Sequence, residues 1–145
     1  MKSLLIATTL IFSSSAFALQ VGDSSTFNGN SNGTLFTLEM TVTQISGDTY
    51  SRHTTVSLGG QSQSSDETGS VSELAQSANV FQNCALAGGS LETIVTPARA
   101  FATCHVTLED GEIYITPEVP FGFVKSITTQ GGSRTEFDLQ SYIMH

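Results

Sequence analysis

The histidines are the side chains of this sequence best suited to acid–base or metal chemistry near neutral pH. There are three, His53, His105 and His145. His53 and His105 fall on the polar faces of predicted strands, so one sheet could bring them together, with Glu39 or Glu112 completing a zinc site. No two of these residues stand at a spacing diagnostic of a metal site, and two ordinary exposed histidines are the alternative. We therefore expect no metal and no cofactor.

Two further patterns resemble chemical sites. The segment Gly29–Gly33 matches G-x-S-x-G, the serine hydrolase motif, but a strand rather than a helix is predicted after it. Two acidic groups could offer oxygen atoms to calcium, but neither follows the D-x-D-x-D-G pattern, and solvated turns explain them. Their members are Asp66, Glu67 and Glu73 in one group and Glu109, Asp110 and Glu112 in the other. We assign no catalytic residue.

The chain has two cysteines, Cys84 and Cys104. An even number of cysteines in an exported chain favours a disulfide. The alternatives are free buried thiols or half of a metal site, although there is no C-x-x-C motif. Closing a ring of about 20 residues is worth roughly 3 kcal/mol in the loop-entropy model. We expect Cys84 and Cys104 to be bonded to each other.

Residues 1–18 have the features of a secretory signal peptide. Lys2 supplies the positive start, Leu4–Phe12 is apolar, and Ala16-Phe17-Ala18 is an A-x-A cleavage site. The apolar stretch is shorter than the roughly 20 residues that span a bilayer. The sequence therefore predicts export to the periplasm or the extracellular space, no membrane-spanning segment, and one domain over residues 19–145.

The composition excludes some classes of partner. The formal net charge is -8, and charged residues make up 12% of the 145 residues, about half the usual ~25%. Nucleic-acid binding needs a basic surface, and so does attachment to anionic lipid headgroups. We expect neither.

Alternation of apolar and polar residues is the dominant pattern, and it predicts antiparallel strands. It is clearest in three segments, Thr34–Ile45, Phe101–Leu108 and Thr135–Ile143. Glycine-containing pairs at hairpin spacing separate these and further strands. They are Gly47-Asp48, Gly59-Gly60, Asp110-Gly111 and Gly131-Gly132. The sequence thus predicts a mainly β fold of about nine strands.

Three segments interrupt the alternation. Asn28–Gly33 and Gln61–Gly69 are polar and are expected to be loops, the second one flexible. Ser70 and Glu73 then form a capping box, which predicts a short helix with an apolar stripe. The stripe consists of Val71, Leu74, Ala75 and Ala78.

The most distinctive apolar segment is Val119–Lys125, with the sequence VPFGFVK. A glycine inside a strand pattern suggests a bulge or a close backbone approach. One interpretation is a core strand with a bend. The other is that Val119, Phe121 and Phe123, together with Leu74 of the helix, line an apolar pocket.

The second half of the chain resembles a known group. The residues that carry the resemblance are Cys84, Gly88-Gly89, Glu92, Pro97, Phe101, Cys104, Val119–Lys125 and the closing strand Glu136–Tyr142. They resemble bacterial exported β-rich proteins that are distantly similar to the periplasmic lipoprotein-carrier (LolA/LolB-like) half-barrels. The resemblance implies one strongly curved sheet, a half-barrel or open barrel, that wraps the helix and offers its concave face to an acyl chain.

These observations favour a non-enzymatic, exported binding protein. Its partner would be an apolar small molecule, a lipidated protein or another envelope protein. Two alternatives stay open: a structural or adhesive component that pairs through a sheet edge, and a small secreted hydrolase or metal-dependent enzyme that uses His53 and His105.

Overall fold

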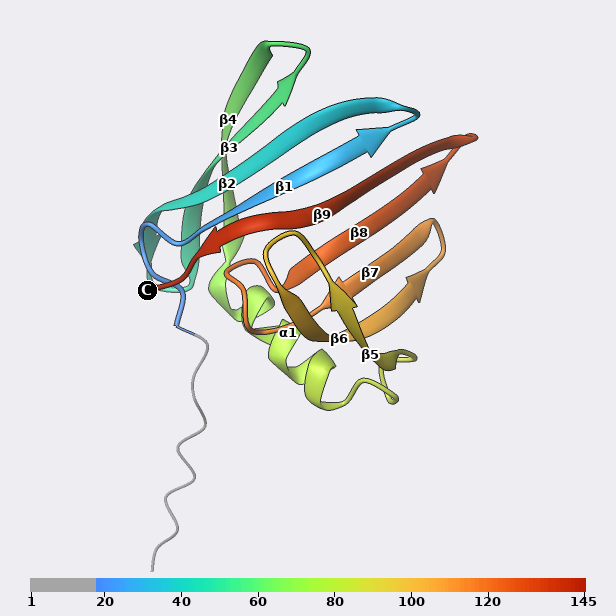
Figure 1. Cartoon of the computed structure of the whole chain (residues 1–145). Helices are drawn as coiled ribbons and strands as arrows, with labels where there is room; N and C mark the ends of the chain where they lie inside the picture. The colour runs from blue at the N-terminus through green and yellow to red at the C-terminus, as the bar shows by residue number, and fades with distance from the viewer. Residues whose placement is uncertain (1–17) are drawn as a thin grey trace, which may run out of the picture.

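The computed structural model describes residues 18–145, so all but the last residue of the expected signal peptide lies outside the described residues. Nine strands and one helix follow each other along the chain (Figure 1). Their bounds are β1 Ser24–Ser31, β2 Thr34–Ser46, β3 Thr49–Leu58, β4 Gln61–Ser70, α1 Val71–Gln82, β5 Ser90–Val95, β6 Ala100–Leu108, β7 Gly111–Ile115, β8 Phe123–Gln130 and β9 Ser133–Ile143. No helix among these residues is long and apolar enough to cross a membrane.

All nine strands belong to one antiparallel sheet in the order β4-β3-β2-β1-β9-β8-β7-β6-β5. The first and last strands pair at its centre, and β4 and β5 are its two open edges. The sheet curls around the side on which α1 lies, and it does not close (Figure 1). Because bulges bend and twist a ladder, the register shifts in the β1–β9, β2–β3 and β7–β8 pairs account for much of this curvature. The predicted mainly β, open half-barrel of about nine strands with one helix is confirmed.

Two segments expected to be loops are strands. β1 continues to Ser31, and the loop predicted over Asn28–Gly33 shrinks to the two-residue turn Asn32-Gly33, where φ is positive at both residues. The segment predicted as a flexible loop over Gln61–Gly69 is strand β4. β4 can be polar on both faces because it is an edge strand that lies beyond the core. Polar pairs with β3, such as Thr55 with Ser64, take the place of apolar contacts.

The Val119–Lys125 segment is only partly a strand. Strand β8 begins at Phe123, and the preceding residues up to Gly122 form turns. Gly122 has φ +78°, and a Cβ there would lie 2.7 Å from the Cβ of Ser77 in α1. The glycine therefore marks a close approach of the backbone to the helix. Of the two predictions for a glycine at this position, a bulge or a close backbone approach, the second is confirmed.

The core fills the space between α1 and the sheet. Its fully buried large side chains come from β1, β2, β6, β8 and β9 and from the turn before β8; they are Phe27, Val42, Phe101, Val119, Val124 and Leu139. Asp23 is also fully buried, and its carboxylate accepts hydrogen bonds from the backbone N–H groups of Gln20 and His145, at 2.9 Å each. This carboxylate holds the segment before β1 against the segment after β9.

Candidate functional site

Four phenylalanines from four adjacent strands form a continuous aromatic surface on the helix side of the sheet. They are Phe36 of β2, Phe27 of β1, Phe137 of β9 and Phe123 of β8, and we call them the aromatic floor. Ring centroids are 5.0 Å apart for Phe27 and Phe123 and 5.3 Å for Phe27 and Phe137. Phe36 and Phe137 follow at 6.4 Å. These separations are those of favourable stacked and edge-to-face pairs.

A glycine makes room for the outermost ring. Gly29 lies directly opposite Phe36 in the β1–β2 ladder. A Cβ on Gly29 would lie 2.1 Å from Cζ of the Phe36 ring, so this ring lies flat over the β1 backbone. Phe36, Phe123 and Phe137 are half-buried, whereas Phe27 is fully buried. Three of the four rings thus keep part of their surface open to solvent.

The apolar surface continues beyond the aromatic floor, away from α1. Leu58 lies opposite Phe36, and Val56 lies opposite Leu38, so all four side chains share one face. Val56 is 39% exposed and Leu58 is 47% exposed. These strand ends extend past α1 towards the hairpin turns (Figure 1). We call the whole concave face, from the helix to Leu58, the trough.

The four residues predicted to line a pocket lie together at the other end of the trough. Leu74 and Phe123 pack against the core cluster that contains Val119 and Phe121. Val119 is fully buried and Phe121 is 5% exposed. The Phe121 ring lies 6.4 Å from the ring of Tyr50. Side chains therefore fill this end, and a ligand beneath α1 would have to displace them or the helix.

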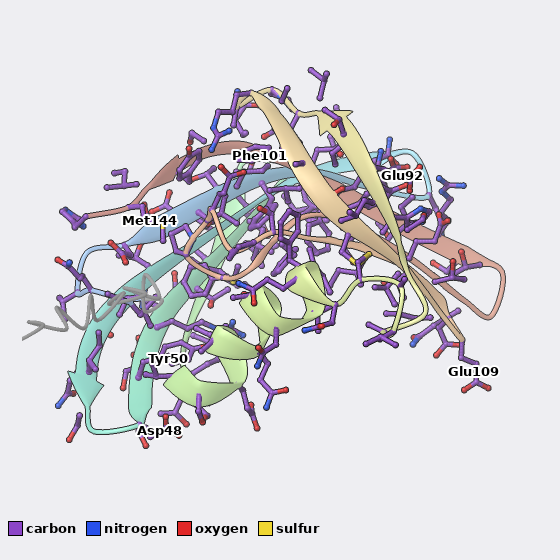
Figure 2. The ribbon with its side chains drawn as sticks, turned by 90° about the horizontal axis from the view of Figure 1, so that it is seen from below. Asp48, Tyr50, Glu92, Phe101, Glu109 and Met144 are labelled. Atoms are coloured by element: carbon purple, nitrogen blue, oxygen red, sulfur yellow. A yellow bond between two sulfur atoms is a disulfide. The ribbon has the colours of Figure 1, made fainter. Side chains whose placement is uncertain are left out.

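Helix α1 is fastened at both ends. At its N-terminus, the Asp48 carboxylate in the β2–β3 turn accepts hydrogen bonds from the hydroxyls of Ser70 and Ser72, and from the Ser72 N–H. These bonds hold the pKa of Asp48 below its usual value of 3.8. Figure 2 shows Asp48 and Tyr50 beside this end of the helix. The predicted helix start at Ser70 is confirmed, and the Ser70 hydroxyl accepts from the Glu73 N–H, which is one of the two bonds of a capping box.

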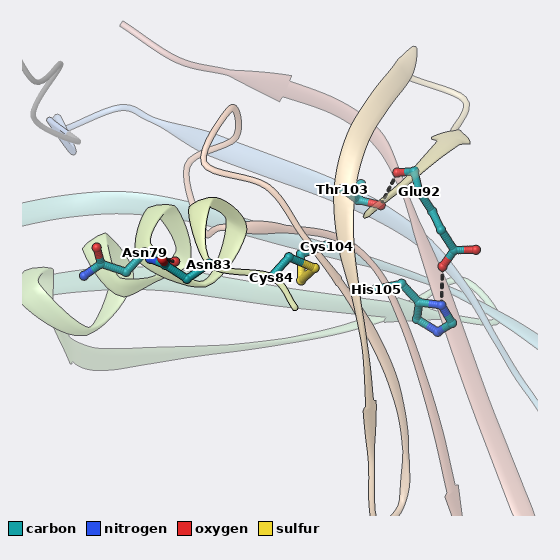
Figure 3. The surroundings of a disulfide bond; sticks show 7 residues. All are labelled: Asn79, Asn83, Cys84, Glu92, Thr103, Cys104 and His105. Atoms are coloured by element: carbon teal, nitrogen blue, oxygen red, sulfur yellow. Dashed lines mark hydrogen bonds and ion pairs between the residues drawn. A yellow bond between two sulfur atoms is a disulfide. The ribbon is translucent and has the colours of Figure 1, made fainter. Parts of the chain in front are cut away.

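The disulfide fastens the C-terminal end. Cys84 follows α1 and is bonded to Cys104 of β6, with an S–S distance of 2.04 Å (Figure 3). The expected pairing is therefore confirmed. A Cβ on Gly89 would lie 2.7 Å from Sγ of Cys104, so the loop after the helix also packs closely against the bridge.

Three buried hydroxyls near the helix-covered end have no hydrogen-bond partner within the described part of the chain. They belong to Ser25, Thr54 and Ser77. Ser25 and Thr54 both lie opposite Met40, one on each side, and both share a face with the trough. A buried hydroxyl left without a partner costs free energy, so a water molecule or a polar ligand group would stabilise this region.

The histidines do not form a joint site. His53 is on β3 and His105 is on β6, with five strands between them in the sheet, so the alternative in which the two histidines approach each other is excluded. Nδ1 of His53 lies 2.8 Å from Asp66. Between residues 18 and 145, no group of three or more His, Cys, Asp or Glu side chains is placed to hold a metal. The two histidines are therefore too far apart for the zinc site, and for the enzyme alternative that uses both of them.

His105 belongs instead to a row of charged side chains on β6 and β7. This row lies on the face of the sheet opposite to that of Cys104. Nε2 lies 2.9 Å from Oε1 of Glu112, and Nδ1 contacts Glu92 (Figure 3). The imidazole stacks on Tyr114 at 4.3 Å. Both ring nitrogens are therefore engaged by carboxylates.

Of the aromatic floor, sequence reasoning identifies Phe123 as a binding residue but does not identify Phe36 or Phe137. Both stood on apolar faces of strands that the alternation predicts. The missing information was the pairing of β1 with β9, which brings the two rings onto one surface.

Comparison with solved structures gives the same fold. MucB in complex with MucA(peri) matches with 16% sequence identity and a TM-score of 0.54, over 88% of this chain and 52% of the MucB chain. A second structure of MucB matches with 19% identity and a TM-score of 0.41, over 86% and 53%. The chain thus spans about half the length of the MucB chains. No protein-family model and no curated protein matches the sequence.

Proposed function

We propose that this chain is an exported, non-enzymatic binding protein whose trough takes an apolar ligand such as an acyl chain. The observation that carries the proposal is the aromatic floor: three of its rings are only partly buried, and the apolar surface continues to Val56 and Leu58. Soluble proteins rarely leave a contiguous apolar surface uncovered unless it binds something. The signal peptide pattern and the disulfide support export.

The chemistry of the trough suits a chain-like ligand. Each CH₂ group removed from water contributes about 0.8 kcal/mol, so a single alkyl chain laid along the floor gains affinity from its length. At the helix-covered end, the buried hydroxyls of Ser25 and Thr54 would offer hydrogen bonds to a polar ligand group only if the ligand displaced the side chains that cover them. Leu74, Val119 and Phe121 would contact the ligand only if α1 moves, and this part of the proposal rests on their position alone.

A protein partner is the second class of ligand that we propose. MucB, which shares the fold, has been solved in complex with MucA(peri). The observation on this chain that favours it is the uncovered apolar edge of the sheet at β5, which has no equivalent at β4.

The trough proposal is tested by titrating a fluorescent long-chain fatty acid into the purified protein. The Leu58→Asp variant places a charge on the trough at an exposed position, and we expect its affinity for the fatty acid to fall at least about tenfold. Leu35→Asp is the matched control, because Leu35 is 72% exposed and neighbours Phe36 but points to the opposite face. Equal losses in both variants, or no saturable binding to the wild type, would contradict the proposal.

A further inference from the structure

Strand β5 is an open sheet edge with free hydrogen-bonding groups. The backbone N–H of Thr96 donates to the carbonyl of Arg99, which sets the phase of the β5–β6 ladder. Directly opposed pairs alternate between bonded and non-bonded, so Ile94 and Glu92 bond to β6. The N–H and C=O groups of Leu91, Thr93 and Val95 consequently point away from the sheet.

The side chains of this edge are apolar and exposed on one face. Leu91 is 68% exposed and Val95 is 82% exposed. Leu91 lies opposite Cys104, so this is the face of the disulfide. There a hollow of about 430 Å³ separates β5 from the end of α1, lined by Phe81, Leu91 and Leu86, of which the last is 89% exposed.

The other face of β5 carries Glu92 and also Ile94, and Ile94 packs against the core. Glu92 holds a carboxylate next to His105, and this carboxylate is 45% exposed. From His53 to Ala98 the sequence contains four acidic residues and no Lys or Arg. Arg99, at the β5–β6 turn, is engaged with Tyr142 and Glu118. A partner that pairs with this edge therefore meets apolar groups on one face and, on the other, the part-exposed Glu92 carboxylate, which shares His105 with Glu112.

β5 also lacks several of the features that normally prevent edge pairing. Natural edges carry lysine, proline, bulges or inward charges. The β5–β6 register runs without a shift, and the strand contains neither Lys nor Pro. The opposite edge, β4, has no apolar side chain and carries Asp66 and Glu67. The β5 edge can therefore pair with a strand that carries apolar side chains, whereas the β4 edge offers such a strand no apolar contact.

The disulfide orders the hollow beside β5. The bridge from Cys84 to Cys104 ties the chain after α1 to β6, the strand that pairs with β5 (Figure 3). Leu86 follows two residues after Cys84 and lines the same hollow as Leu91. A surface that is ordered before binding loses less entropy when the partner arrives.

We propose that β5 docks an extended, basic segment of a protein partner as an additional strand. Apolar side chains of this segment alternate with Lys or Arg: the apolar ones enter the hollow beside Leu86 and Leu91, and the basic ones face Glu92. The inference rests on the proposed binding role, but not on an apolar ligand in the trough.

The test uses a synthetic peptide in which Leu and Lys alternate, with a Leu/Glu peptide as its control. We expect the Leu/Lys peptide to bind, with an affinity that falls as salt rises, and to slow hydrogen exchange at the amides of Leu91, Thr93 and Val95. Thr93→Pro removes one outward N–H without breaking the β5–β6 ladder. Loss of that bond should weaken binding about tenfold.

Ser64→Pro is the matched control on the opposite edge, where the two-residue Gly59-Gly60 turn places the Ser64 N–H outward. It should leave peptide binding unchanged. If Thr93→Pro fails to fold, Val95→Lys at an exposed position replaces it and should weaken binding through charge repulsion. Protection at β4, equal binding of the Leu/Glu peptide, or self-association through β5 would overturn the proposal. Leu58→Asp should bind the peptide normally, so the two proposals fail independently.

Discussion

The two ends of the trough are built from the same kinds of residue and differ in how they are covered. At the helix end, Val119 and Phe121 are buried and α1 is fastened by Asp48 and by the disulfide. At the far end, Phe36 and Leu58 lie on the same face of the sheet but no element covers them. The buried contacts that stabilise the fold are therefore concentrated at the helix end, and the exposed apolar surface lies at the far end.

The contrast follows from the length of the strands. β2 has 13 residues and β9 has 11, whereas α1 has 12 residues at a much shorter rise. One short helix cannot cover strands of this length, so part of the apolar face stays open. A substitution at the far end should therefore have little effect on the packing of the core.

Phe121→Ala should produce the largest loss of stability. Removing a buried phenylalanine leaves a cavity beneath α1 and costs about 3–5 kcal/mol of unfolding free energy. Phe36→Ala removes a half-exposed ring and should cost less than half as much. Urea denaturation of both variants measures the two values, and similar losses would show that the two ends are not different in kind.

Removal of the disulfide should come next. The double variant Cys84→Ser/Cys104→Ser should lose about 3 kcal/mol, because the unfolded chain regains its loop entropy. Hydrogen exchange should rise in α1 and in the following loop, while the amides of β1 and β9 keep their relative protection. Reduction of the wild type offers a matched comparison, and an unchanged unfolding midpoint under both conditions would refute the expectation.

The smallest effect is expected for Asp48→Asn. Hydrogen bonds from Ser70 and Ser72 lower the pKa of Asp48 in the folded state. The carboxylate therefore stabilises the fold fully above the unfolded value of about 3.9, and this contribution disappears as the pH falls through the lowered pKa. Asn at this position should lower Tm slightly at neutral pH and flatten its decline below about pH 4. Glu109→Gln, in an exposed turn, is the control, and equal slopes in both variants would exclude the helix-capping role.

Much of the fold could be predicted from the sequence because strand alternation and glycine turns are local signals. β4 was not predicted because the residues of Gln61–Gly69 are polar on both faces, so the segment shows no alternation of apolar and polar side chains. The end of β1 was not predicted because Asn28 and Asn30 resemble loop residues. In the structure the Asn28 amide donates to Gln140 of β9, and the Asn30 side-chain oxygen accepts from the Gly33 N–H in the β1–β2 turn. The site was harder, since Phe36 and Phe137 meet only through a pairing between distant segments.

That central pairing has a consequence for folding kinetics. β1 and β9 lie at opposite ends of the described chain, yet they form the middle of the sheet. The β1–β4 meander and the β5–β9 meander can each form from neighbours in sequence, but the contact between them closes a loop of about a hundred residues, at an entropic cost that grows with loop length. A sheet with such a high contact order folds in milliseconds to seconds rather than microseconds. β9 follows the other eight strands along the chain, so the sheet can be completed only after this central strand has been synthesised.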